Sequence, residues 1–76
     1  MKIHVRRRHI EMGKRFSSRE CPVALACAEV FGGVVSVSQW GLRSTDGFHT
    51  LPLPAQRFID NFDSRKPVKP FTFVLK

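Results

Sequence analysis

The sequence lacks the features that mark membrane-spanning and secreted proteins. Among its 76 residues, no apolar run approaches the about 18–20 residues that a transmembrane helix requires. The basic N-terminal segment is not followed by the apolar stretch of a secretory signal. Only two cysteines are present, and without a secretory signal they are expected to be free thiols in a reducing compartment. We therefore expect a cytoplasmic protein with no membrane partner.

Acidic residues are also scarce. Six Asp and Glu stand against 13 Lys and Arg, and the formal net charge is +7. Residues 1–20 carry seven of these cations against two acids, while the other 56 residues carry six against four. Mimicry of DNA requires an acidic surface and is excluded by this sign. The N-terminal surplus predicts an anionic partner, either nucleic acid or an acidic protein surface; the alternative is a solvated edge that keeps a small protein soluble.

The most apolar stretch is Cys21–Phe31, which predicts a helix whose only charged side chain is Glu29. A helix that is apolar on all sides must be covered on most of them, so this one is expected at the centre of the core. Pro22 suits the first helical position, and the two glycines that follow Phe31 suit a left-handed C-cap. A rival start at Ser17–Glu20 has capping-box spacing, but it would place the proline where its missing N–H breaks the first helical bonds.

Four strands are expected around this helix, at residues 2–6, 34–40, 48–51 and 71–75. In the first, alternation predicts that Ile3 and Val5 face inward while His4 and Arg6 face outward. Residues 7–18 are expected to form a connection, with one short helical turn near His9–Met12. Ser44–Gly47 contains the Asp-Gly pair of a hairpin turn, and Gly41, inside the preceding arm, is expected to mark a bulge.

A second helix is predicted to begin at Pro54 and to end before Pro67. Its apolar residues recur at helical spacing and form one buried stripe: Ala55, Phe58, Ile59 and Phe62. In the last strand, Phe71, Phe73 and Leu75 share a face. Residues 1–76 therefore form a single α+β domain of β-α-β-β-α-β order, a two-layer sandwich with an antiparallel sheet and two helices on one face. A ferredoxin-like winding and an irregular meander both fit this order.

Metal and cofactor sites are not predicted. The candidate ligands include no CxxC or HxxxH pair: His4, His9, His49, Cys21 and Cys27. The two cysteines lie six residues apart on one helix and project about 120° from each other. Cys21 at a helix N-terminus could be a nucleophile, but no orienting group or oxyanion loop accompanies it, and a buried capping cysteine is the commoner role. The sequence therefore predicts a protein that is not an enzyme.

A binding surface is predicted instead at the basic N-terminal edge, where side chains could follow a phosphate backbone: Arg6, Arg7, Arg8, Lys14, Arg15 and Arg19. No helix-turn-helix or RRM signature is present, so sequence-specific readout is not expected. Trp40 has no clear inward register. It would be an interaction hot spot if exposed, but packing in the core is the role that the sequence favours.

Several short motifs resemble a family of small bacteriophage- and prophage-encoded proteins without an established activity. The motifs that carry the resemblance are Ile3-His4-Val5, the spacing of Ile10 and Gly13, Cys21–Ala26, Pro52-Leu53-Pro54, Phe58-Ile59 with Phe62-Asp63, and Pro67-Val68 with Pro70–Phe73. The resemblance implies a phage gene, and small phage proteins often act against host defence, as anti-CRISPR proteins do.

From this resemblance and the basic edge we expect a protein that inhibits or redirects a host protein or nucleoprotein complex in the bacterial cytoplasm. A nucleic-acid-binding accessory protein that contacts DNA or RNA is the alternative. An exposed strand edge leaves both a monomer and a homodimer open.

Overall fold

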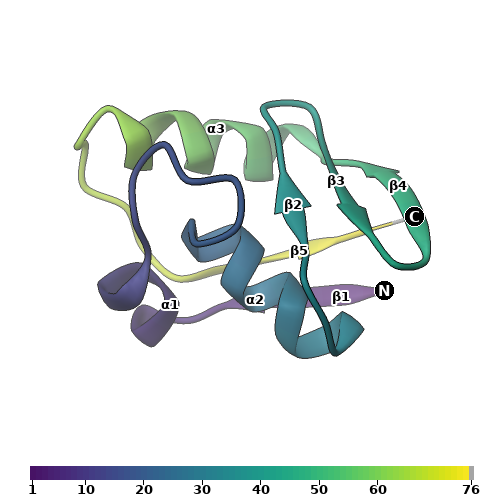
Figure 1. Cartoon of the computed structure of the whole chain (residues 1–76). Coiled ribbons are helices and arrows are strands. Elements are labelled where there is room, and N and C mark those ends of the chain that lie inside the picture. Colours follow the sequence, from purple (N-terminus) through teal and green to yellow (C-terminus); the bar gives the residue numbers. More distant parts are fainter. Residues whose placement is uncertain (76) are drawn as a thin grey trace.

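Three helices and five strands follow one another along residues 1–75, the part of the chain that the computed structural model describes (Figure 1). Their order and bounds are β1 Lys2–Val5, α1 Arg7–Met12, α2 Pro22–Phe31, β2 Ser36–Val37, β3 Gly41–Ser44, β4 Gly47–Thr50, α3 Leu53–Asp63 and β5 Phe71–Val74. All paired strands are antiparallel. The predicted α+β class is confirmed, while the predicted order of elements is not.

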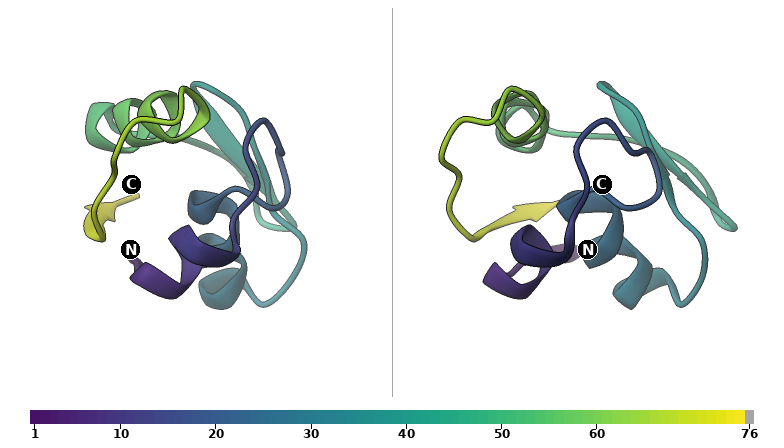
Figure 2. Two further views of the ribbon diagram at one scale, coloured as in Figure 1. Left: turned by 90° about the vertical axis from the view of Figure 1, so that its left-hand side faces the viewer. Right: turned by 60° about the vertical axis from the view of Figure 1, so that its left-hand side comes forward.

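Helix α2 is the centre of the core, as its composition predicts. Val23, Ala24 and Cys27 have no exposed surface. The helix contacts β1 and β2, which belong to different sheets, and it also contacts α1 and α3. Figure 2 shows it between the two sheets. A helix that is apolar all round needs cover on several sides, and one sheet face could cover only one of them.

The strands therefore form two sheets, and the predicted single sheet with two helices on one face is wrong. One sheet pairs β1 with β5, which brings the two ends of the described chain side by side with Ile3 opposite Phe73. The other has the order β2-β3-β4. Among the described strands the ferredoxin-like winding does not occur, because β1 pairs only with β5.

The ends of α2 are those that the sequence predicts. The sulfur of Cys21 accepts a hydrogen bond from the Ala24 N–H at 3.4 Å, and Gly32 takes the left-handed conformation with φ 76°. The alternative helix start at Ser17–Glu20 forms only a turn. In it the Ser17 hydroxyl accepts a hydrogen bond from the Glu20 N–H at 3.0 Å. The helix itself begins after that turn, because Pro22 fits the first helical position and not a later one.

The predicted strand at residues 34–40 is wrong in extent. Only Ser36 and Val37 are paired, and the chain bends at Gln39 and Trp40. The Ser38 hydroxyl donates to the Gly41 carbonyl at 3.1 Å and lies 3.3 Å from the Gly41 N–H, which donates to it. Such local side-chain bonds compete with a continuing strand. Gly41 is thus no bulge inside an arm but the first residue of β3, opposite Thr50.

Most other elements match the sequence prediction. Ile3 and Val5 are buried while His4 is exposed. The expected turn after β1 is a complete short helix, α1. The predicted stripe of α3 is buried as a set: Ala55, Phe58, Ile59 and Phe62. In and after β5, Phe73 and Leu75 are buried, as alternation requires.

Candidate functional site

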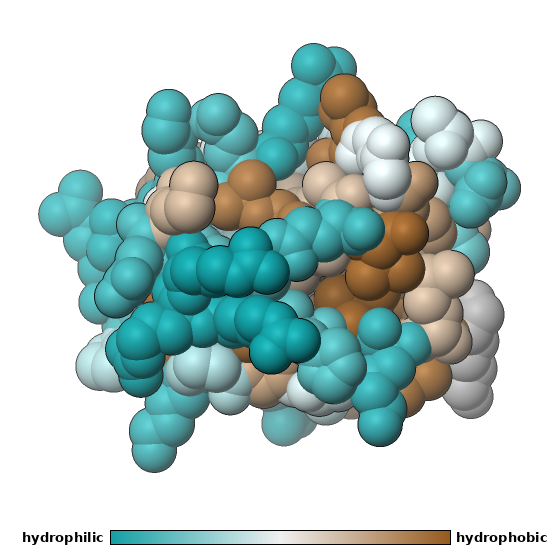
Figure 3. Space-filling model, turned by 90° about the horizontal axis from the view of Figure 1, so that it is seen from below, coloured by the Kyte–Doolittle hydropathy of each residue, from teal (hydrophilic) through white to brown (hydrophobic). Residues whose placement is uncertain are grey.

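The six basic residues of the predicted N-terminal binding surface are all exposed, but they differ in whether other residues of the chain engage their charge. Figure 3 shows hydrophilic side chains gathered on the α1 side of the molecule, next to an apolar region. Three of the six are engaged within the chain. Arg8 pairs with Glu29, the ammonium of Lys14 lies 3.3 Å from the Glu20 carboxylate, and Arg15 lies over the Phe62 ring at 5.5 Å. The remaining three are Arg6, Arg7 and Arg19, for which no ion pair occurs within residues 1–75.

Arg6 and Arg7 border a groove of about 310 Å³ where β1 runs into α1. The opposite wall comes from the start of β5, because the register places His4 opposite Thr72 and Val5 opposite Phe71. The ring nitrogen Nδ1 of His4 lies 3.1 Å from the Thr72 hydroxyl, which joins the two walls. Residues almost a whole chain apart therefore build this groove.

A second groove, of about 400 Å³, continues from the first between α3 and residues 67–71. The two share Pro70 and Phe71, and we call them together the basic groove. Its charged side chains are Arg6, Arg7, Arg57 and Lys69, and within the described chain no carboxylate lines either part. A concave surface of one charge sign focuses the electrostatic field and attracts oppositely charged partners.

The basic groove is lined by an aromatic ring, Phe71, that packs against other aromatic rings of the protein. The half-buried ring of Phe71 lies 4.7 Å from the ring of Phe58 and 5.5 Å from that of Phe73, measured between centroids. An aromatic ring that binds a nucleic-acid base needs a free face. The ring of Phe71 is therefore packed against two aromatic neighbours, which leaves less of it available for stacking on a base.

The position of Arg6 and Arg7 depends on a buried histidine, His9, which begins the short helical turn expected from the sequence. His9 is 3 % exposed. Its Nδ1 accepts the Arg6 N–H at 2.9 Å, so its Nε2 carries the proton and donates to the Glu29 carboxylate at 2.9 Å. Arg8 donates to the other oxygen of Glu29, also at 2.9 Å. The Arg8 hydrogen bonds, and after them that of His9, hold the pKa of Glu29 at about 2, below its usual 4.5.

These hydrogen bonds fix α1 on α2, and they occupy both nitrogens of the His9 ring. Because both ring nitrogens are engaged by the protein, His9 cannot act as a general base while the fold is intact. The sequence reading missed the contact because Arg8 and Glu29 lie 21 residues apart. The one available signal was Glu29 itself, a single charge on an otherwise apolar helix.

The two cysteines are buried free thiols. Burial raises the pKa of Cys21, and the Ala24 N–H offsets this only in part. Burial, followed by the nearby Cys21, raises the pKa of Cys27 to about 12. A nucleophilic cysteine needs a lowered pKa, and burial acts in the opposite direction on both thiols. In residues 1–75, no group of three or more His, Cys, Asp or Glu side chains is placed to hold a metal ion.

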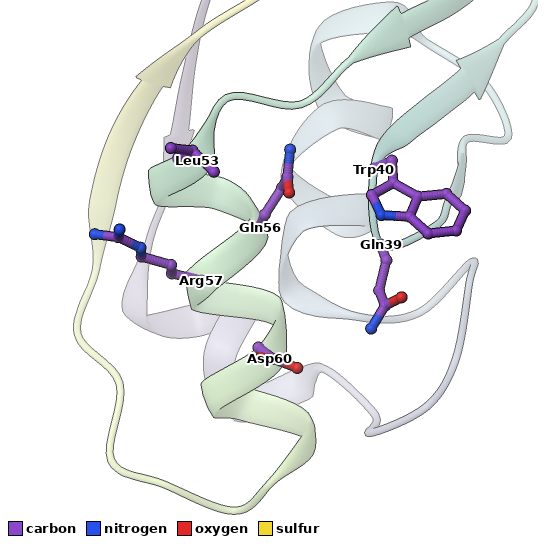
Figure 4. A pocket seen from close by; sticks show the side chains of 6 residues that line it. All are labelled: Gln39, Trp40, Leu53, Gln56, Arg57 and Asp60. Atoms are coloured by element: carbon purple, nitrogen blue, oxygen red, sulfur yellow. The ribbon is translucent and has the colours of Figure 1, made fainter.

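Trp40 is 69 % exposed, so the expectation that it packs in the core is wrong. It lies beside an open pocket of about 230 Å³ formed with Gln39 and the outer side of α3. In Figure 4 the side chains that line this pocket point in different directions and do not converge on one place. Gln56 is committed to the Leu51 carbonyl at 2.8 Å. The exposed indole meets the condition that the sequence analysis set for an interaction hot spot.

No protein-family model, curated protein or solved structure matches the chain. The resemblance to phage-encoded proteins therefore stays a prediction. None of the helices in the described part of the chain has the length and apolar character needed to cross a membrane.

Proposed function

We propose that this chain is a small binding protein that inhibits or redirects a nucleic-acid-handling host complex by docking its basic groove on an anionic surface of that complex. The observation that carries the proposal is the groove itself, in which four cations face solvent and no carboxylate from residues 1–75 neutralises them. The resemblance to phage proteins supports a host complex as the partner.

The charge of the whole molecule supports the same role. A net charge of +7 on 76 residues steers the chain toward negative surfaces and raises the rate of association. The arginines of the groove can each hold a carboxylate or phosphate through two parallel hydrogen bonds. Binding of this kind must weaken as salt concentration rises.

A nucleic-acid-binding accessory protein is the second candidate, because the same cations could follow a phosphate backbone. The engaged ring of Phe71 favours the first candidate, since proteins that bind single strands combine cations with aromatic rings that have a free face.

The decisive experiment compares two double charge reversals in affinity capture from bacterial lysate, with and without nuclease. Arg6→Glu with Arg7→Glu changes the groove. Arg65→Glu with Lys66→Glu makes the same change of charge beyond the end of α3, at exposed residues outside the groove. We expect the wild type and the control variant to retain a host complex after nuclease treatment, and the groove variant to lose it.

Two results would decide against this function. Equal loss of capture in both variants would show that overall charge, and not the groove, mediates binding. Capture that disappears after nuclease would favour the accessory protein. In that case the affinity for a labelled single-stranded oligonucleotide should fall steeply with salt. The slope of the logarithm of the binding constant against the logarithm of the salt concentration should become shallower by about 0.7 for each phosphate contact that is removed.

A further inference from the structure

The outer edge of β4 presents unused backbone groups. The Leu51 N–H donates to the Trp40 carbonyl at 2.8 Å, and the register continues with His49 opposite Leu42. Hydrogen-bonded pairs alternate along an antiparallel ladder, so residues 47, 49 and 51 direct their backbone groups toward β3. Phe48 and Thr50 direct theirs away from it. Within residues 1–75, these outward groups make no backbone hydrogen bond.

The outer edge of β5 has the same character. The Leu75 N–H donates to the Met1 carbonyl at 2.8 Å, and the Met1 ammonium donates to the Leu75 carbonyl at 2.9 Å. The register then places the backbone groups of residues 71 and 73 toward β1. Those of Thr72 and Val74 point to the other side.

These two edges border one cleft. Its volume is about 460 Å³, and it is lined by residues 48–52 of β4 and the segment after it, together with Val74 of β5. Two apolar side chains stand at its rim, since Phe48 is 56 % exposed and Val74 is 54 % exposed. A cleft that combines unpaired strand edges with apolar side chains matches the needs of an extended peptide, which brings both backbone groups and alternating side chains.

Proteins usually protect such an edge. Lysine, proline, a bulge or a very short strand are the common devices. β2 is protected by its length of two residues. β4 has four residues with neither lysine nor proline among them, and Phe48 lies in its middle. Among residues 1–75, the outer edge of β4 beside this cleft is thus without a strand partner.

We propose that this cleft binds an extended, negatively charged peptide segment of a partner protein, which pairs with β4 as an additional strand. The charge of the chain selects this occupant over a second copy, because pairing two copies would bring together two chains of net charge +7. On the exposed face of the hairpin, Arg43 lies directly opposite Phe48 and adds to the positive field there. Apolar side chains of the peptide cover Phe48 and Val74, while its acidic side chains face solvent and the basic surface.

This inference goes beyond the proposed function and does not depend on it, since none of the groove cations lines the cleft. A groove variant that no longer binds its complex would still bind the peptide. The two failures are therefore distinguishable.

The test uses a blocked hexapeptide of alternating Glu and Val as the probe, with a control peptide of equal charge whose central Val is Pro. Binding is followed by amide spectra and hydrogen exchange of the ¹⁵N-labelled chain. We expect the first peptide to slow exchange of the Phe48 and Thr50 amides, which face solvent in the free chain. The proline peptide cannot complete the ladder and should bind about tenfold more weakly.

Thr50→Pro and Thr50→Val form the matched pair of variants. Thr50→Pro removes one outward N–H, and proline is tolerated on an edge strand at such a position. It should weaken binding by about tenfold, while Thr50→Val, which keeps the N–H, should change it by less than about twofold.

Three outcomes would overturn the proposal. The first is absence of binding by the Glu-Val peptide. The second is slowed exchange elsewhere without slowed exchange at Phe48 and Thr50, a measurement that needs no variant to fold. The third is a homodimer that forms through the same edge at the concentrations used, which would make a second copy the occupant.

Discussion

The buried ring of His9 donates from Nε2 to the carboxylate of Glu29 at 2.9 Å and so ties α1 to the only charged side chain of α2. The same ring accepts the backbone N–H of Arg6 through Nδ1. One histidine therefore anchors the short helix at whose start Arg6 and Arg7, two of the four cations of the basic groove, lie. A six-residue helix is not stable by itself in water, so its position depends on such tertiary contacts.

Glu29 should make the stability of the fold sensitive to acid. Its pKa is about 2 in the folded chain and about 4.5 when the partners are lost. A depressed pKa contributes stability that is fully present above about pH 4.5 and is lost as pH falls through about 2. Denaturant unfolding followed by far-UV circular dichroism should therefore show a smaller loss between pH 5 and 2 for Glu29→Gln than for the wild type. Parallel pH profiles would contradict this assignment.

Charge reversal at adjacent arginines should have different effects on folding. Arg8→Glu places a carboxylate against Glu29 and should lower the urea midpoint clearly. Arg7→Glu, at an exposed position without an ion pair in residues 1–75, should change stability by less than about 0.5 kcal/mol. Urea titration of the two variants checks this prediction. Adding Glu29→Arg to Arg8→Glu should restore part of the lost stability. Equal midpoints for the two single variants would show that the ion pair does not hold α1.

Gly13 should not tolerate a side chain. A Cβ there would lie 2.6 Å from Cδ of the buried Pro22 and 2.8 Å from the His9 carbonyl oxygen. Neither can move freely, because Pro22 begins α2 and the His9 carbonyl caps α1 through the Gly13 N–H. Gly13→Ala should destabilise the fold by about 1–3 kcal/mol. Gly33→Ala is the control, since nothing lies within 4 Å of its added Cβ, and a loss as large in that variant would remove the steric explanation.

The cysteines should be unreactive in the folded chain. With a pKa of about 12, Cys27 is ionised in only about one molecule in ten thousand at pH 8. Cys21 is also buried, and its pKa is raised for the same reason. Labelling by a disulfide reagent at pH 8 should therefore be slow in buffer and should accelerate with urea as the chain opens. Fast labelling in buffer, at a rate that urea does not change, would show an accessible thiol.

Local signals account for the parts of the fold that the sequence predicted correctly. The bounds of α2 follow from Pro22 and Gly32, whose backbone preferences act within one turn of the helix. The faces of β1 and α3 follow from periodicity, which each segment carries by itself. The predicted strand at residues 34–40 was too long for a local reason as well. The Ser38 side chain forms hydrogen bonds with the backbone of Gly41, and the strand ends early.

The candidate site could be predicted only in part, since charge is visible in a sequence but its neutralisation is not. The exposure of Arg6 was foreseeable from alternation, and that of Arg7 and Arg8 from their charge. That Arg8 is taken by Glu29 was not, and neither was the part of Arg57 and Lys69 in the same groove. Trp40 is exposed because the chain bends at Gln39 and Trp40, and the periodicity of the sequence does not predict that bend.

The sequence by itself determined an α+β domain with an apolar central helix, the direction in which most side chains of its strands and helices face, and a positive N-terminal end. Only the tertiary structure decided that the strands divide into two sheets, that β1 and β5 bring distant cations and aromatic rings to one groove, and that β4 keeps an open edge. The physical reason is range. Backbone propensity and periodicity act over a few residues, whereas the partners of Arg8, His4 and Val5 lie 21 to 68 residues away and are chosen by how the whole core packs.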